Sequence, residues 1–392
     1  MRICFVTPEF LVINKSSTGL PNYLYRVSKS LKEKGHEPII ITAGDKNENV
    51  YYDGIEVIRR NTYITLKSKP VIEYIINALR MSRILNKELS KLCLIKKIDI
   101  IQFCSLYGLA IFYFGHVPSI IRLSSYAKKT FENNKTHSAM AILFMSLIER
   151  LGAKRVNAII SPSNIMAKEY GRDVRRRVKV IESPFLKDVN KEDDSIYKEK
   201  FLGKKYMLFY GTLYEVKGIL VIANIISKVL EKNSDYYFAF IGGVQKYKGK
   251  SFLKIIKESA GEYCNRVIHI GSLDHEKLYP IIKHSDFVVL PSLMENLSNA
   301  CIESMSFGKV VIGTDGTSFE QLIVDGESGF LAIPNNAESL YEKITAAINL
   351  EENNKIRMQK NAKKRVEKLQ PDKAVSKLLR YYQFIIKKDR RT

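Results

Sequence analysis

Apolar and polar positions follow one another in short blocks that predict alternating strands and helices. Residues 2–7 form an apolar run that predicts a strand, and a loop rich in Ser, Thr and Gly follows it. The spacing of apolar residues over 21–34 predicts a helix with Gly35 as its C-cap, and residues 38–42 predict the next strand. This strand–loop–helix–strand order is typical of a parallel, doubly wound sheet. Further strands are predicted at 56–59, 98–103, 119–123 and 158–161, with a long helix at 71–91.

The same pattern starts again in the second half of the chain. A polar, charged stretch at 187–205 predicts a linker. Beyond it, residues 206–210 predict a strand, 219–231 a helix and 237–241 a strand. Later strands are predicted at 267–270, 287–291 and 310–313, and later helices at 298–307 and 338–350, before two basic helical stretches.

The expected fold class is therefore α/β, with two Rossmann-like doubly wound domains. We expect a first domain over 1–186, a linker over 187–205, a second domain over 206–370, and a C-terminal helix over 371–392 that crosses back to the first domain. A ligand site is expected where the carboxyl ends of both sheets face a cleft.

Length and composition agree with two packed domains. The 392 residues exceed what one core usually holds, and 45% of them are hydrophobic. The five cysteines are scattered without a C-x-x-C pair, which argues against a disulfide framework or a zinc site. The N-terminus lacks the features of a signal peptide, and the apolar run at 139–148 is too short to span a bilayer, so we expect a cytoplasmic protein.

The positive charge is unevenly distributed along the chain. The formal net charge is +22, of which residues 1–200 carry +14, residues 201–350 carry −1 and residues 351–392 carry +9. This distribution predicts one basic face. Such a face could bind the headgroups of an anionic membrane or the phosphates of a nucleic acid, and charge alone does not choose between them.

The segment from Pro291 to Gly308 concentrates the candidate chemistry. A buried strand leads to Glu295 in a loop, Ser298 is placed to cap the next helix, and Glu303 lies on that helix among apolar residues. The start of such a helix presents backbone N–H groups to an anion, for example a diphosphate. Carboxylates on either side are suited to accept hydrogen bonds from sugar hydroxyls.

This segment reads P-S-x-x-E-N-x-x-N-x-x-x-E-S-M-S-x-G-K-V-V, and it resembles the E-x7-E signature of retaining GT-B glycosyltransferases of glycosyltransferase family 4. Residues 211–218, G-T-L-Y-E-V-K-G, look like the family's G-R-L-x-x-x-K-G loop, and 325–329 look like its D-G-x-x-G. In the first half, Thr18-Gly19, the G-H-E at 35–37 and the S-P-S-N at 161–164 are also similar to family segments.

The resemblance implies a GT-B fold and a nucleotide-sugar donor, with UDP- or GDP-sugars favoured, bound mainly by the second domain. Glu303 would hold the ribose hydroxyls, Glu295 would contact the donor sugar, and Lys217 would neutralise the departing diphosphate. Asn296, Leu297 and Ser298 would offer backbone amides near the phosphates, and Gly19 would let the first domain approach them. Glu295 and Lys217 are thus the expected catalytic residues.

The resemblance further implies transfer to a polysaccharide, glycolipid or lipid-linked acceptor by a protein on the inner membrane face. No cofactor is expected, and with no convincing D-x-D for a metal–diphosphate complex, metal-independent transfer is expected.

Two positions depart from the family pattern. Thr212 stands where the family usually has Arg in the donor loop, which removes one leaving-group cation. Ser124 stands where a first-domain His is common, and His116 is interpreted as an ordinary loop residue. Arg122 could supply the missing charge, although we interpret it as a surface residue.

Other functions stay open at this level. A nucleic-acid-binding protein would need aromatic residues among the basic clusters, and Tyr381-Tyr382 is the only faint case, better explained by core packing. A nucleotide-sugar isomerase or hydrolase, or a donor-binding protein without catalysis, would share the same fold.

Overall fold

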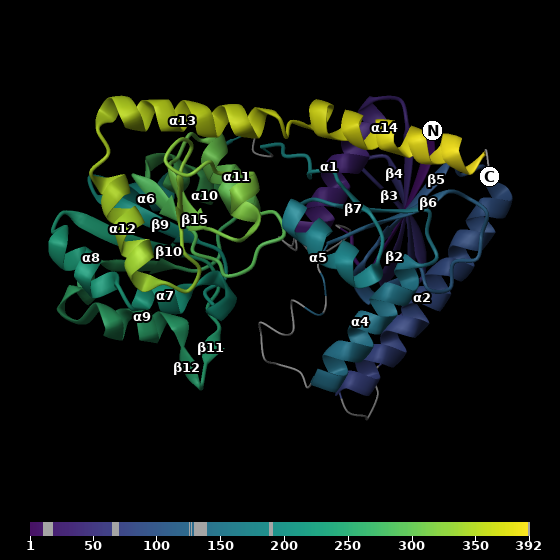
Figure 1. Ribbon diagram of the computed structural model, residues 1–392, viewed down its shortest axis with the longest axis horizontal. Coiled ribbons are helices and arrows are strands. Elements are labelled where there is room, and N and C mark those ends of the chain that lie inside the picture. The colour runs from purple at the N-terminus through teal and green to yellow at the C-terminus, as the bar shows by residue number, and fades with distance from the viewer. Residues whose placement is uncertain are drawn as a thin grey trace. The chain divides into compact units, whose positions relative to one another are not determined.

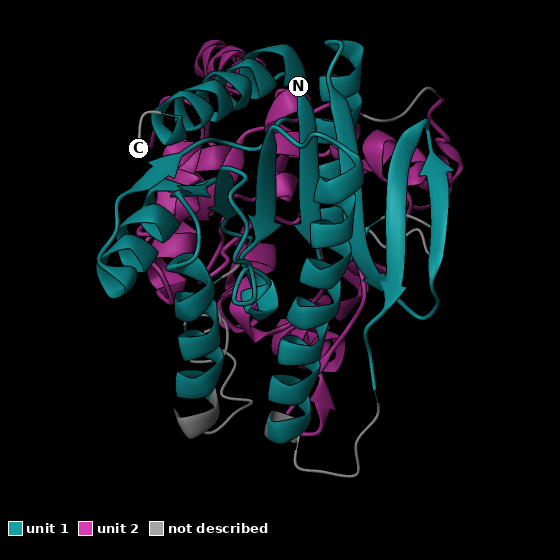
Figure 2. Ribbon diagram, turned by 90° about the vertical axis from the view of Figure 1, so that its right-hand side faces the viewer, with its two compact units in different colours: residues 1–184, 369–392 teal, residues 185–368 magenta. Residues whose placement is uncertain are grey.

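The structure is a computed structural model that describes residues 1–10, 19–64, 70–124, 126, 128, 139–187 and 191–390. The chain divides into two compact units, coloured separately in Figure 2. Unit 1 comprises Met1–Pro184 together with Leu369–Thr392, and unit 2 comprises Phe185–Lys368. The C-terminal segment thus belongs to the same unit as the N-terminus. Among the described residues, no helix is long and apolar enough to span a bilayer.

Unit 1 is built on an eight-stranded sheet of order β3-β4-β2-β1-β5-β6-β7-β8. The strands pair in parallel except for β3, which is antiparallel to β4. The strands are β1 (Arg2–Thr7), β2 (Glu37–Gly44), β3 (Glu48–Tyr52), β4 (Ile55–Asn61), β5 (Ile100–Cys104), β6 (Ser119–Arg122), β7 (Ala158–Ser161) and β8 (Val178–Val180). The helices are α1 (Gly19–Glu33), α2 (Pro70–Ile95), α4 (Ala139–Ala153), α5 (Asn164–Val174) and α14 (Pro371–Asp389).

The two faces of this sheet form separate cores because successive side chains of a strand point to opposite sides. Ile3 and Phe5 of β1 pack with α1 and α14, whereas Cys4 and Val6 pack with α2 and α5. Helix α14 is joined to this unit by polar contacts as well, since the hydroxyl of its Tyr382 donates to Gln102 Oε1 at 2.7 Å. Tyr382 is fully buried, which confirms the core-packing interpretation for that residue.

Unit 2 contains a six-stranded parallel sheet of order β13-β10-β9-β14-β15-β16. Its strands are β9 (Lys205–Tyr210), β10 (Tyr236–Ile241), β13 (Val267–Ile270), β14 (Phe287–Val289), β15 (Val311–Thr314) and β16 (Phe330–Ala332). Its helices are α6 (Ser195–Lys200), α7 (Ile219–Ala223), α8 (Ile226–Lys232), α9 (Phe252–Ala260), α10 (His275–His284), α11 (Asn299–Ser306), α12 (Ala337–Ile348) and α13 (Glu352–Glu367). A small hairpin, β11 (Lys246–Tyr247) with β12 (Lys250–Ser251), follows β10. Figure 1 labels most of these elements.

The predicted α/β class with two Rossmann-like sheets is confirmed, but several elements differ from the sequence prediction. The helix expected at 219–231 is two helices, α7 and α8, that break at Asn224, a poor helix former. Helix α6 lies inside the stretch predicted as a linker, and none of its residues is buried. The strands that the sequence missed include β3, β8 and β16, all of which lie at sheet edges and lack long apolar runs.

Candidate active site

The loops that follow β9 and β14, two neighbouring strands of unit 2, are locked together at the carboxyl edge of the sheet. The amide of Leu293 donates to the carbonyl oxygen of Val216 at 2.8 Å. Gly218 has φ +73°, and a Cβ built on it would lie 1.9 Å from the Pro291 carbonyl oxygen. Only glycine permits this approach without moving the backbone. The contact fixes the position of Lys217 relative to Glu295.

Lys217 and Glu295 form an ion pair in which Lys217 Nζ donates to Glu295 Oε1. The pair is partly shielded from solvent, with 26% of the Lys217 side chain and 13% of the Glu295 side chain exposed. Burial by itself would lower the pKa of Lys217, but attraction to Glu295 and the hydrogen bond outweigh it and raise that pKa. Lys217 therefore carries a fixed positive charge at the sheet edge, adjacent to a carboxylate.

A second contact between loops orders the turn that contains Thr212. The amide of Leu213 donates to the Gly243 carbonyl at 2.8 Å, and the amide of Gln245 donates back to Leu213 at 3.0 Å. Gly242 has φ +141°, and a Cβ there would lie 2.1 Å from the Gly211 carbonyl oxygen. Thr212 is exposed within this ordered turn.

Helix α11 begins at the same edge of the sheet. Ser298 caps it, and its hydroxyl accepts a hydrogen bond from the Cys301 amide at 3.3 Å, which confirms the predicted cap. The preceding Asn296 and Leu297 are partly buried. The first turn of a helix leaves further N–H groups without intrahelical acceptors, so this end suits an anionic ligand.

Glu303 lies on α11 with only 5% of its surface exposed, so it is not a solvated helix acid. Its Oε1 lies 3.4 Å from Nε2 of His275, the first residue of α10. The neighbouring Tyr210 hydroxyl lies 2.9 Å from Ser304 Oγ. Burial, and secondly the charge of Glu303, raise the pKa of Tyr210, so its hydroxyl stays neutral.

His275 is a site residue that sequence reasoning missed. It follows β13 by a short loop, and the carboxyl end of a parallel strand is where ligand-binding side chains collect. The position of His275 just after a predicted strand could therefore have marked it as a candidate, but the sequence analysis predicted no helix at 275–284. Without α10, nothing in the sequence brought His275 near Glu303.

Two family models together match most of the chain. The model described as "Glycosyltransferase Family 4" matches residues 17–184, and the one described as "Glycosyl transferases group 1" matches residues 190–365. The chain belongs to glycosyltransferase family 4. The second match includes Lys217, Glu295 and Glu303.

Known proteins similar to this chain agree with the family. An uncharacterised glycosyltransferase of Methanocaldococcus jannaschii is 32% identical over 167 residues, covering 42% of this chain and 41% of the relative. A lipopolysaccharide 1,2-N-acetylglucosaminetransferase of Salmonella typhimurium is 22% identical over 205 residues, covering 51% of this chain and 49% of the relative. The matched parts thus span less than half the length of both curated relatives.

A solved structure extends the likeness over the whole chain. Anabaena HepE in complex with UDP and glucose has a TM-score of 0.71 at 13% identity, covering 98% of this chain and 99% of that chain. At this identity the likeness concerns the fold. It confirms the expected GT-B fold of the family-4 chain, with a Rossmann-like sheet of mainly parallel strands in unit 1 and of parallel strands in unit 2.

The remaining predicted residues lie in both units. Gly19 is the first residue of α1 in unit 1 and is exposed, whereas the other predicted site residues lie in unit 2. The Thr18 that precedes it lies outside the described residues.

The family's D-G-x-x-G at 325–329 forms a turn, in which the Gly326 amide donates to the Gly329 carbonyl at 2.9 Å. Across the described residues, no group of three or more His, Cys, Asp or Glu side chains could hold a metal ion.

The interpretation of Arg122 as a surface residue was wrong. Arg122 ends β6 and is 5% exposed, and its guanidinium lies 3.4 Å from the centre of the Tyr23 ring. It donates to the hydroxyls of Ser124 at 3.2 Å and Ser183 at 2.7 Å. The strand alternation directs this long side chain inward, which sequence charge alone does not reveal. His116 is exposed in the loop before β6.

Proposed function

We propose that this protein transfers a sugar, with retention of anomeric configuration, from a nucleotide-sugar to a saccharide or lipid-linked acceptor. The observation that carries the proposal is the ion pair of Lys217 with Glu295 at the carboxyl edge of the unit 2 sheet. A cation held in this way stabilises the negative charge that grows on a departing nucleoside diphosphate. The neighbouring start of α11 adds amide dipoles for the same phosphates.

The bond that breaks joins the anomeric carbon of the donor sugar to a phosphate oxygen. In the proposed arrangement Lys217 neutralises that oxygen as its bond electrons return to it, while Glu295 accepts hydrogen bonds from the sugar. The acceptor hydroxyl oxygen forms the new bond to the anomeric carbon, and its proton passes to the departing phosphate. Glu303 accepts hydrogen bonds from the ribose hydroxyls, and its burial strengthens them because water competes less. Lys217 and α11 would supply the positive charge, so we propose transfer without a metal ion.

A UDP- or GDP-sugar is the proposed donor. HepE, a protein of the same fold, forms a complex with UDP and glucose, which supports a nucleotide-sugar as the donor of this chain. The acceptor class is supported by the name of the Salmonella relative, a lipopolysaccharide glycosyltransferase, and by the excess positive charge of residues 1–200. Thr212 leaves the donor loop with a hydroxyl in place of the family's usual cation.

A thermal-shift screen against UDP-, GDP-, ADP- and dTDP-sugars tests the donor site. One nucleotide family should raise the unfolding midpoint of the wild type, because a ligand that binds only the folded state stabilises it. The variant Glu303→Ala should show no such rise. If no nucleotide raises the midpoint, or if Glu303→Ala responds like the wild type, the proposed donor site is wrong.

A second experiment separates transfer from related reactions. The stabilising donor is incubated with EDTA and with candidate acceptors, and the anomeric configuration of the product is determined by proton NMR. A retained configuration on an acceptor supports the proposal. Cleavage or rearrangement of the donor with equal rates with and without acceptor would instead identify a nucleotide-sugar hydrolase or isomerase.

A further inference from the structure

Two helices of unit 1 expose large apolar side chains near their N-terminal ends. Between 40% and 63% of each of these side chains is exposed: Ile72 and Ile76 on α2, and Leu143, Phe144 and Leu147 on α4. On each helix these positions are three or four residues apart or adjacent, so they lie on one side of the helix. Large apolar side chains exposed together on one side of a helix mark an interaction site.

Basic residues continue the same exposed faces toward the C-terminal ends of both helices. Arg80, Arg83 and Lys87 are exposed on α2, Arg150 is exposed on α4, and Lys154 is exposed directly after α4. We call these five basic residues, together with the five apolar ones, the α2–α4 surface.

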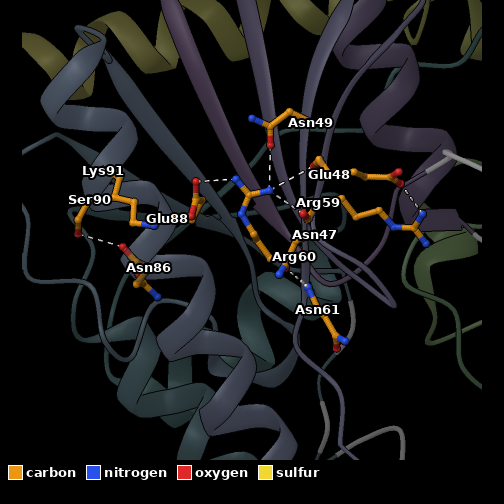
Figure 3. A network of polar contacts seen from close by, with 10 residues as sticks. All are labelled: Asn47, Glu48, Asn49, Arg59, Arg60, Asn61, Asn86, Glu88, Ser90 and Lys91. Atoms are coloured by element: carbon orange, nitrogen blue, oxygen red, sulfur yellow. Dashed lines mark hydrogen bonds and ion pairs between the residues drawn. The ribbon is translucent and has the colours of Figure 1, made fainter.

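The acidic residues of the two helices are all less exposed than these basic residues, and Glu73 and Glu88 are half-buried. Glu149 of α4 is 1% exposed. Glu88 of α2 accepts a hydrogen bond from Arg60 Nη2 at 2.7 Å, within the polar network that Figure 3 shows. Glu73 accepts a hydrogen bond from the Tyr63 hydroxyl at 3.2 Å. The exposed charges of the α2–α4 surface are therefore positive.

The two helices are fixed next to each other by the segment between β5 and β6. In α2, Ser82 and Asn86 both donate to the carbonyl oxygen of Leu109, at 2.9 and 2.7 Å. In α4, Ile148 packs so closely on Gly108 that a Cβ on the glycine would lie 2.5 Å from Ile148 Cγ2. Figures 1 and 2 both show the helices side by side, with their N-terminal ends at the same end of unit 1.

We propose that the α2–α4 surface docks unit 1 on a bilayer containing anionic phospholipids. The apolar side chains would enter the interface between headgroups and acyl chains, and the arginines and lysines would contact lipid phosphates. A second copy of the chain fits less well because like charges would face each other. A nucleic acid fits less well because the apolar residues are mostly aliphatic and do not stack on bases. The proposal goes beyond donor chemistry and does not depend on it.

Co-sedimentation with vesicles tests the apolar part of the surface. Wild type should pellet with equimolar phosphatidylcholine and phosphatidylglycerol, and much less with phosphatidylcholine alone. The triple substitution Leu143→Ser, Phe144→Ser and Leu147→Ser should lower the partition coefficient at least about tenfold. The control Leu202→Ser changes a side chain of unit 2 that is 63% exposed, and it should pellet like the wild type.

The charged part is tested in the same way. Arg80→Glu with Arg83→Glu should lower binding at least about tenfold and weaken its dependence on salt. Lys254→Glu with Lys257→Glu makes the same charge change in unit 2 and is the matched control. An equal loss of vesicle binding in the two double variants would show that only the net charge of the protein matters, and it would overturn the proposal.

A fluorescent probe gives a direct readout, because the chain has no tryptophan. Phe144→Trp introduces a single one on the α2–α4 surface, and its emission should shift to the blue on addition of the anionic vesicles. The emission of the control Leu202→Trp should not shift when the vesicles are added. A blue shift of Phe144→Trp that depends on protein concentration without vesicles would identify a second copy as the occupant and contradict the proposal. The thermal shift caused by the nucleotide is also measured for each variant. A variant that loses vesicle binding but keeps this shift has an intact donor site, so the two proposals are tested separately.

Discussion

Lys217 Nζ donates a hydrogen bond to Glu295 Oε1, although the two residues are 78 positions apart in the chain. The parallel pairing of β9 with β14 brings their loops to one edge of the sheet, and the contact of Gly218 with Pro291 fixes the distance between those loops. A cation and a carboxylate are therefore held in place by backbone packing. Such preorganisation is what charge stabilisation in a transition state requires.

Removing the cation should slow transfer more than it weakens donor binding. For Lys217→Met we expect kcat to fall by about 100- to 1,000-fold while KM for the donor changes much less, because a preorganised group that stabilises developing charge acts mainly in the transition state. Initial rates with the donor found by thermal shift measure this. Lys217→Arg keeps the charge but not its position, and its rate should lie between those of the wild type and Lys217→Met. A Lys217→Met rate near that of the wild type would remove Lys217 from the mechanism.

Replacing Glu303 by glutamine should weaken nucleotide binding. A hydrogen bond to a charged group is worth about 1.5–3 kcal/mol, so Glu303→Gln should raise the Kd for the nucleoside diphosphate about 10- to 100-fold. Calorimetric titration with UDP and GDP measures the change.

The neighbour of Glu303 provides a second test of the same pocket. His275 Nε2 lies 3.4 Å from Glu303 Oε1, and we expect it to orient that carboxylate. His275→Ala should raise the nucleotide Kd less than Glu303→Gln does, about three- to tenfold, because the carboxylate remains. Its kcat at saturating donor should stay near that of the wild type. A large loss of kcat would place His275 in the chemical step instead.

The glycine that joins the two loops should tolerate no side chain. Gly218→Ala combines a left-handed backbone with a Cβ 1.9 Å from a carbonyl oxygen, so we expect a loss of about 2–5 kcal/mol of stability. Gly203→Ala is the control, because Gly203 has φ +76° with nothing within 4 Å of its Cβ position. Gly203→Ala should lower the free energy of unfolding by only about 1 kcal/mol. Urea denaturation compares the two, and equal losses would show that the Pro291 contact is unimportant.

The sequence predicted those parts of the fold that depend on local pattern. The apolar runs of β1, β2, β9 and β10 and the cap at Ser298 were visible because burial and capping leave a periodic signal. The burial of Arg122 and the approach of His275 to Glu303 were not visible. Both depend on tertiary contacts between segments distant in sequence, which no local spacing encodes.

Lys309, which follows α11, is half-buried. Its Nζ donates to the Ser285 carbonyl oxygen, a neutral acceptor, at 2.7 Å. Burial, and secondly repulsion by Lys355, lower the pKa of Lys309 from 10.5 to about 8. Between about pH 8 and 10.5 the unfolded chain therefore binds more protons than the folded protein, so the stability of the wild type rises with pH in that range. Below about pH 8 the full cost of the buried charge is present.

Lys309→Met removes that charge and should stabilise the protein at pH 7. A shift of this size corresponds to roughly 3 kcal/mol, and loss of the hydrogen bond to Ser285 offsets about 1 kcal/mol, so the expected gain is about 2 kcal/mol. The gain should shrink from pH 8 to 10.5, because the folded wild type has already released the Lys309 proton and proton binding stabilises the unfolded chain less as the pH rises. Thermal unfolding of both proteins across this range measures the difference, with Lys360→Met at an exposed position as the control. A gain that is independent of pH would mean that better packing, and not removal of a charge, stabilises the variant.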